Sequence, residues 1–160
     1  MTPIEELAAL LLARGWMLAT AESCTGGMIA AACTDLAGSS AWFERGFVTY
    51  SNAAKSELLA VDAALIQRHG AVSEPVARAM AHGAVQHSAA QVSVAVTGVA
   101  GPTGGSAEKP VGTVWFGFVV DGQLTSELRR FDGDRAAVRT ATVRHAIDGL
   151  LLRLRAVGRT

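Results

Sequence analysis

The chain has 160 residues, half of them hydrophobic and 18% charged, a composition typical of a soluble globular protein and not of a disordered segment. Fourteen basic residues balance fourteen acidic ones, which argues against a nucleic-acid-binding surface. No apolar run approaches the roughly 18 residues that cross a bilayer, so no membrane partner is expected.

The N-terminal residues and the cysteines favour a cytoplasmic protein. Glu5 and Glu6 make the N-terminus acidic, whereas a secretory signal peptide begins with basic residues. Two cysteines, Cys24 and Cys33, do not indicate a disulfide framework in that compartment. The length suits one domain with its own core, and we expect residues 1–160 to form a single domain.

The first half of the chain alternates helical and strand-like patterns. Residues 3–14 have apolar positions at helical spacing and should form a helix that ends near Gly15. Residues 16–19 are typical of a short strand, and a turn rich in hydroxyl groups and glycine (20–27) leads from it into a helix through about residue 36. A second strand is expected at 46–50, followed by a helix that Ser51 or Asn52 caps, and by a helical turn at 62–68.

The second half ends in a hairpin and a long helix. Residues 73–88 begin with a serine, an acid and an early proline, which predicts a helix. Residues 92–97 are valine-rich, as in a buried strand, and open into a glycine-rich loop at 98–105. Residues 111–120 and 124–131 should pair around Asp121-Gly122. The last helix should start after residues 132–134 and face the sheet with a stripe of apolar side chains: Val143, Ile147, Leu150, Leu151 and Leu154.

About five strands interleave with four or five helices, which predicts an α/β fold. Alternation favours a mostly parallel sheet covered on both faces, and the Asp121-Gly122 hairpin makes that sheet mixed. Ligands bind at the loops that follow strand ends in such sheets. Unusual side chains follow the strand ends expected after Ala19, Val48 and Val96. We therefore expect these three loops to build one site.

The turn after the first strand presents Ser23, Cys24 and Thr25 beside two glycines. Such a turn offers hydroxyl groups and unpaired backbone N–H groups, which suit a phosphate cradle or a nucleophile beside its oxyanion hole. Ser23 would need a base to take its proton. Cys24 is a candidate reactive thiol or a small residue that packs under the turn.

Lys55 is a candidate for that base. It lies in the first turn of an expected helix, where the helix dipole and partial burial would both lower its pKa and favour the neutral amine. The alternative is a solvated surface lysine. Tyr50, the only tyrosine, either relays a proton, hydrogen-bonds a substrate, or closes the core with its hydroxyl at the rim.

The second glycine-rich loop and the last helix supply candidate phosphate ligands. Residues 101–106 could approach a phosphate through backbone N–H groups, although no Walker A lysine follows. Arg135 and Arg139 share one helix face and could clamp a phosphate; otherwise they form a solvated face beside Asp132 and Asp134. The four histidines do not cluster with cysteines, so no metal site is expected.

Five ordered blocks of sequence resemble the CinA C-terminal domain family over nearly the whole chain. They are residues 21–27 (Ala-Glu-Ser-Cys-Thr-Gly-Gly), 50–55 (Tyr-Ser-Asn-Ala-Ala-Lys), 70–73 (Gly-Ala-Val-Ser), 101–105 (Gly-Pro-Thr-Gly-Gly) with 109–114 (Lys-Pro-Val-Gly-Thr-Val), and 133–135 (Gly-Asp-Arg). The resemblance implies a three-layer α/β/α sandwich with a mixed five-stranded sheet. It also implies an amidase that hydrolyses the carboxamide of nicotinamide mononucleotide to nicotinate mononucleotide and ammonia, without metal or cofactor.

The resemblance further implies roles for individual residues. Ser23 would be the nucleophile and Lys55 its base, with Tyr50 nearby. For the oxyanion, our own candidates are the backbone N–H groups of Thr25, Gly26 and Gly27. From charge and position alone, and not from the resemblance, we expect the ribose phosphate to lie against the second loop (Gly101, Gly104 and Gly105) and Arg135 or Arg139.

Two other functions remain open at this point. The same loops could form a nucleotide-binding module without catalysis, or Cys24 could act as the nucleophile of a cysteine hydrolase. Long CinA proteins have an additional N-terminal domain with pyrophosphatase activity, which we do not expect here. Helices rich in small residues lead us to expect a homo-oligomer.

Overall fold

Strand β1 (Leu18–Glu22) is buried along its whole length and lies inside the sheet, between two parallel neighbours. The computed structural model describes residues 1–158. Four further strands complete a five-stranded sheet in the order β2-β1-β3-β4-β5: β2 (Phe43–Val48), β3 (Val92–Gly98), β4 (Thr113–Val120) and β5 (Gln123–Arg130). β1 is parallel to β2 and β3, whereas β4 is antiparallel to both β3 and β5. The expected mixed sheet of an α/β fold is confirmed, with β4 running opposite to the other strands described.

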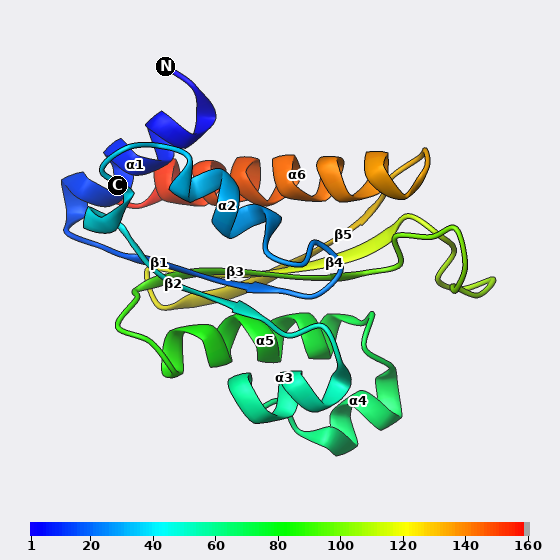
Figure 1. The fold of residues 1–160 in the computed structure, drawn as a ribbon. Coiled ribbons are helices and arrows are strands. Elements are labelled where there is room, and N and C mark those ends of the chain that lie inside the picture. Colours follow the sequence, from blue (N-terminus) through cyan, green and yellow to red (C-terminus); the bar gives the residue numbers. More distant parts are fainter. Residues whose placement is uncertain (159–160) are drawn as a thin grey trace.

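Helices cover both faces of this sheet, as Figure 1 shows. α1 (Pro3–Arg14), α2 (Met28–Thr34) and α6 (Arg135–Ala156) form one outer layer. α3 (Asn52–Leu59), α4 (Ala63–His69) and α5 (Glu74–Gln86) form the other, and a short 3-10 turn, η1 (Ser39–Ala41), precedes β2. This is the expected three-layer α/β/α sandwich. None of the helices among residues 1–158 is long and apolar enough to cross a membrane.

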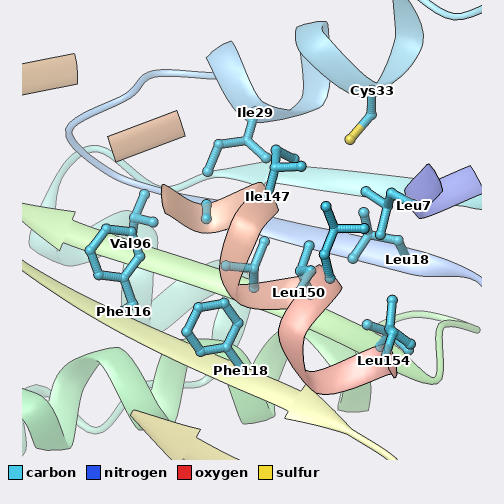
Figure 2. Close-up of a cluster of buried hydrophobic side chains, with 14 of the residues drawn as sticks. Leu7, Leu18, Ile29, Cys33, Val96, Phe116, Phe118, Ile147, Leu150 and Leu154 are labelled. Carbon is cyan, nitrogen blue, oxygen red and sulfur yellow. The ribbon is translucent and has the colours of Figure 1, made fainter. Parts of the chain in front are cut away.

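The larger hydrophobic cluster lies between the sheet and the layer of α1, α2 and α6. Figure 2 shows Ile147, Leu150 and Leu154 of α6 in this cluster with Phe116 and Phe118 of β4. The apolar stripe expected on the last helix is therefore buried, apart from Val143, which is half-buried. Each fully buried Leu or Phe contributes roughly 1.5–3 kcal/mol to folding, so this face anchors α6 along the sheet.

On the opposite face, small residues let α5 pack closely on the sheet. A Cβ atom at Gly117 of β4 would lie 2.4 Å from the carbonyl oxygen of Ala77, closer than any real packing contact. Val76, Met80 and Ala84 of α5 are buried, and Val85 is half-buried. Ser73 precedes α5, but its hydroxyl donates to Gly70 O instead of capping the helix.

Strands β1 and β2 differ most from the expected bounds, and both differences concern the site. β1 runs from Leu18 to Glu22, whereas residues 16–19 were expected, because Thr20 and Glu22 pair in the ladder and are buried despite their polar side chains. β2 ends at Val48 and begins three residues earlier than expected, at Phe43. The Asp121-Gly122 turn is confirmed: both residues have positive φ, as a two-residue type I′ hairpin requires.

The topology explains why distant residues meet. β1, β2 and β3 are parallel, so their carboxyl ends share one edge of the sheet. The loops after these three strands lead to α2, to α3 and to the glycine-rich segment from Val99 onward. Residues 23, 55 and 101 are thereby brought to the same edge.

Candidate active site

Ser23 immediately follows β1 and sits in a tight turn. Its N–H donates to Val96 O on β3 at 3.2 Å, and its own carbonyl accepts from the Gly26 N–H at 3.1 Å. Gly26 and Gly27 both have positive φ, a conformation that glycine adopts without a steric penalty. The serine side chain is 9% exposed, so its hydroxyl is sheltered but reachable from solvent.

Lys55 points into the protein from the first turn of α3 and is 1% exposed. Its Nζ lies 3.0 Å from Ser23 Oγ, 3.0 Å from Thr49 O and 3.2 Å from Tyr50 O. Ser51 caps α3 through the Ala54 N–H, which fixes the start of the helix that carries the lysine. The alternative of a solvated surface lysine is therefore wrong.

Burial lowers the pKa of Lys55 below its ordinary value, because the ammonium form loses hydration in this setting. A neutral amine donates two hydrogen bonds and keeps one lone pair. The carbonyls of Thr49 and Tyr50 can accept both N–H groups, which leaves the lone pair for the Ser23 hydroxyl. The arrangement is that of a serine next to a base.

Arg139 holds the same turn from the side of α6. Its Nε donates to Cys24 O at 3.1 Å and its Nη2 to Thr25 O at 3.3 Å. Arg139 was selected as a candidate phosphate ligand, and the structure places two of its three nitrogens on these backbone carbonyls. Nη1 has no hydrogen-bond partner among residues 1–158 and remains available.

Arg135, one turn earlier in α6, joins Tyr50 to the second glycine-rich loop. Its Nη1 donates to Gly101 O at 2.9 Å, and its Nη2 lies 3.4 Å from the Tyr50 hydroxyl. The Tyr50 ring is 62% exposed, so it does not close the core. Its carbonyl contacts Lys55 and its hydroxyl meets Arg135, which places Tyr50 between the serine–lysine pair and the arginine.

Other candidate residues lie less close to the pair. Gly104 and Gly105 are exposed, have positive φ, and form no hydrogen bond with Ser23 or Lys55 within the described part of the chain. Gly105 instead fits against its own loop, where a Cβ would lie 2.9 Å from Lys109 O. Lys109 donates to His69 O at 2.8 Å and holds this loop to the end of α4.

Burial, together with the nearby Glu22 carboxylate, raises the pKa of the Cys24 thiol to about 11. The thiol is therefore protonated at neutral pH, and only the thiolate is a good nucleophile. Cys24 is 7% exposed and Cys33 is fully buried. The packing interpretation of Cys24 fits this setting better than the reactive one.

The hydrogen bonds of the turn show which backbone donors remain. The N–H of Gly26 is used by Ser23 O and that of Met28 by Thr25 O. Within residues 1–158, the N–H groups of Thr25 and Gly27 have no acceptor. Of the three donors expected to hold an oxyanion, two remain unoccupied.

Glu22, the residue before Ser23, is a site residue that sequence reasoning missed. Its side chain is fully buried. Oε1 accepts from Thr25 Oγ1 at 2.5 Å and from the Ile29 N–H at 2.8 Å, and Oε2 accepts from the Ala30 N–H at 3.1 Å. A charged residue inside a strand was the available signal, but a period-two pattern alone does not separate it from a loop residue.

No group of three or more His, Cys, Asp or Glu that could bind a metal occurs among residues 1–158. His145 lies on the far half of α6, where its Nε2 is 2.6 Å from Glu127 Oε2 of β5. Arg153 completes this cluster through a 3.0 Å bond to Glu127. These residues form an ion-pair cluster between α6 and β5.

Comparison with known proteins places this fold and these residues in one family. A sequence model described as the CinA C-terminal domain matches residues 2–154. A protein of Enterobacter agglomerans named nicotinamide-nucleotide amidohydrolase PncC is 60% identical over 84% of this chain and 82% of its own length. The protein of that name in Escherichia coli is 52% identical, over 91% of this chain and 89% of its own.

A solved structure agrees with the sequence comparisons. The crystal structure titled competence damage-inducible protein A from Klebsiella pneumoniae subsp. pneumoniae superposes with a TM-score of 0.93 at 41% identity. The alignment covers 97% of this chain and 96% of that one. The similarity therefore extends over the whole sandwich, including the edge that carries the candidate site.

Proposed function

Because the chain belongs to the CinA C-terminal domain family, we propose that it is a nicotinamide-nucleotide amidase. It hydrolyses the carboxamide of nicotinamide mononucleotide to nicotinate mononucleotide and ammonia. The observation that carries the proposal is the 3.0 Å contact between Lys55 Nζ and Ser23 Oγ inside a buried setting, in a chain whose relatives have that activity in their names.

The first half of the reaction makes an ester. The neutral Lys55 amine takes the Ser23 proton, and the alkoxide attacks the carboxamide carbon to give a tetrahedral intermediate. The N–H groups of Thr25 and Gly27 hold the oxyanion, and removal of one such donor typically costs about 3–4 kcal/mol of transition-state stabilisation. The Lys55 ammonium returns the proton to the leaving nitrogen, ammonia departs, and the acyl group stays on Ser23 Oγ.

The second half breaks that ester with water. Lys55, neutral again, takes a proton from a water molecule, and the hydroxide attacks the acyl carbon. The ester bond to Ser23 Oγ breaks, and the serine recovers its proton from Lys55. Nicotinate mononucleotide leaves, so the overall consumption is one water for each ammonia released.

The ribose phosphate end of the substrate would lie near Arg135 and the second glycine-rich loop. Arg135 is exposed and lies between Tyr50 and Gly101, so a phosphate could displace its weak 3.4 Å contact with the tyrosine hydroxyl. Backbone N–H groups near Gly101, Gly104 and Gly105, and the remaining Nη1 of Arg139, offer further donors for the phosphate.

The pH dependence of ammonia release tests this function. We expect kcat/KM for nicotinamide mononucleotide to rise with pH as Lys55 loses its proton, with a midpoint below the usual lysine pKa of about 10.4. The rate rises with pH because only the deprotonated amine can take the Ser23 proton. Burial lowers the pKa of Lys55, so this rise occurs at lower pH than for a solvated lysine. The same ionisation makes folding more favourable as pH rises between the folded and unfolded pKa values.

Saturable binding of the mononucleotide without ammonia release at any pH would favour the non-catalytic module instead. Turnover that decreases as pH rises from 6 to 9 would contradict the role of Lys55. Ammonia can be quantified with a coupled glutamate dehydrogenase assay, which must be calibrated separately at each pH.

We also propose that the chain forms a homo-oligomer through a groove between α1, α2 and α6, with a volume of about 610 Å³. Its apolar lining comprises Pro3, Ile4, Met28, Ala31, Ala32, Val143 and Ile147. The lining also contains Arg144, Asp35 and Asp148, so a two-fold contact could pair opposite charges between copies. Sedimentation of the protein at a mass above that of one chain is expected, and a monomer at micromolar concentration would contradict this proposal.

The two unpaired cysteines are consistent with the proposed location in the cytoplasm. Cys24 and Cys33 are both buried free thiols within the described residues. The cytoplasm keeps thiols reduced, so neither would be lost to oxidation there.

A further inference from the structure

Glu22 accepts three hydrogen bonds, from the nucleophile turn and from the start of the helix that follows it. Its carboxylate receives the Thr25 hydroxyl, from within the turn, and the Ile29 and Ala30 N–H groups, from the start of α2. The N-cap residue of α2, Gly27, has no side chain with which to satisfy these backbone donors. The buried carboxylate of Glu22 therefore connects the turn, through Thr25, to the start of α2, through Ile29 and Ala30.

Arg139 acts on the same turn with the opposite charge. Its guanidinium binds the carbonyls of Cys24 and Thr25, the acceptors of the turn, while Glu22 binds its donors. Between them, these two side chains leave the N–H groups of Thr25 and Gly27 without acceptors among the described residues. Ser23 is thus the first residue of a turn in which Glu22 accepts from the Thr25 hydroxyl and Arg139 donates to two of the carbonyls.

We propose that Glu22 is a positioning residue that sets the orientation of the Ser23 hydroxyl and of the free Thr25 and Gly27 N–H groups. The inference rests on the proposed amidase function for its kinetic consequences. Glu22 acts through the turn and through Thr25. Its main chain also shares the edge with β2, since the Thr49 N–H donates to Glu22 O at 2.8 Å. One residue therefore links the serine to the segment that holds Lys55.

The buried carboxylate of Glu22 does more than fill the space beside α2. Burying a charge is costly unless hydrogen bonds compensate it, and an apolar side chain would pack there without that cost. The three bonds to Glu22 keep one turn geometry among those that the two flexible glycines allow. An apolar residue would fill the space and leave the turn free to change conformation.

Glu22→Gln tests the role with the least change in volume. The variant loses the charge and one of its acceptor oxygens. We expect kcat for ammonia release from nicotinamide mononucleotide to fall about 30-fold, with KM within about threefold of the wild type, because small displacements of reacting groups cost rate more than binding. Amide hydrogen exchange at Ile29 and Ala30 should become faster in the same variant.

Glu127→Gln is the matched control. Glu127 is another glutamate whose carboxylate is held by other side chains, but it is only partly buried and lies on β5 in the cluster with His145 and Arg153. We expect this control to lower the melting temperature while kcat and the exchange at Ile29 and Ala30 stay at wild-type values. A merely structural role for Glu22 would lower the melting temperature and speed exchange at Ile29 and Ala30 while leaving kcat unchanged.

A Thr25 pair decides the question if Glu22→Gln does not fold. Thr25→Val removes the hydroxyl that binds Glu22 at nearly constant volume, and Thr25→Ser keeps it. We expect the valine variant to lose about tenfold in kcat and the serine variant to recover at least half of the wild-type rate. Folded Glu22→Gln, or Thr25→Val, with kcat within threefold of the wild type would overturn the proposal.

Failure of the proposed function would look different. If the wild type releases no ammonia from the mononucleotide, the amidase proposal fails before any variant is compared. The exchange measurement needs no substrate, so it still reports whether Glu22 holds the turn. Unchanged exchange at Ile29 and Ala30 in Glu22→Gln would overturn the positioning role on its own.

Discussion

Replacing Lys55 with methionine is expected to lower kcat for ammonia release by about 10⁴-fold, the upper range for loss of a positioned general base. Methionine fills a similar buried volume but has no lone pair of comparable basicity for the Ser23 proton. Lys55 is buried and its Nζ contacts Ser23 Oγ directly, so we expect no other side chain to replace it as the base. The acidic limb of the pH profile should disappear together with the activity. Steady-state ammonia release at several pH values measures both effects.

Lys109→Met is the control for this prediction, because Lys109 is the only other lysine in the chain. Its Nζ binds His69 O at the end of α4, away from the serine. We expect the control to keep kcat within about threefold of the wild type, as for surface substitutions away from a site. A folded Lys55→Met protein with more than a tenth of wild-type activity would contradict the assignment of the base.

Ser23→Ala is expected to reduce kcat by about 10⁵-fold or more, as for loss of the nucleophile in other serine hydrolases. The substitution removes only one oxygen from a nearly buried side chain, so the fold and the backbone N–H groups should persist. The mononucleotide should still bind, with an affinity close to that of the wild type. Isothermal titration calorimetry on the variant, alongside the ammonia assay, separates binding from turnover.

Two further variants make the Ser23 result specific. Ser93→Ala removes another buried hydroxyl, which donates to Ala81 O on the opposite face of the sheet, and should leave kcat unchanged. Cys24→Ala should also retain activity, since the raised pKa keeps the thiol protonated. Full activity in Ser23→Ala with loss in Cys24→Ala would instead identify a cysteine hydrolase.

The fold could be predicted from the sequence because its signals are local. The Asp121-Gly122 turn, the valine-rich β3 and the apolar stripe of α6 each predict one element, and the alternation of strands and helices predicts a sheet covered on both faces. The family resemblance is confirmed by the match over residues 2–154. The strand ends predicted one site built by three loops, and the family resemblance implied the pairing of Ser23 with Lys55. The structure places these two groups in contact.

The supporting residues could not be predicted in the same way. Glu22 looks like part of a polar turn, and only the ladder with β2 and β3 reveals that it lies in a strand with a buried side chain. Arg139 looks like a phosphate ligand, because helix spacing gives its face but not its partners. Its contacts with Cys24 O and Thr25 O depend on how closely α6 approaches the turn, and no local pattern encodes that distance.

Partitioning of the reaction with hydroxylamine tests the central claim, an acyl group on Ser23, most directly. Ammonia leaves through the site, so a nucleophile of similar size can enter it and compete with water for the ester. We predict that the hydroxamate of nicotinate mononucleotide appears beside the acid, in a share that rises with hydroxylamine concentration, while ammonia release does not slow. An enzyme-free control corrects for direct reaction of the substrate. Ammonia release at the normal rate with the acid as the only product would show direct attack by water and contradict the account.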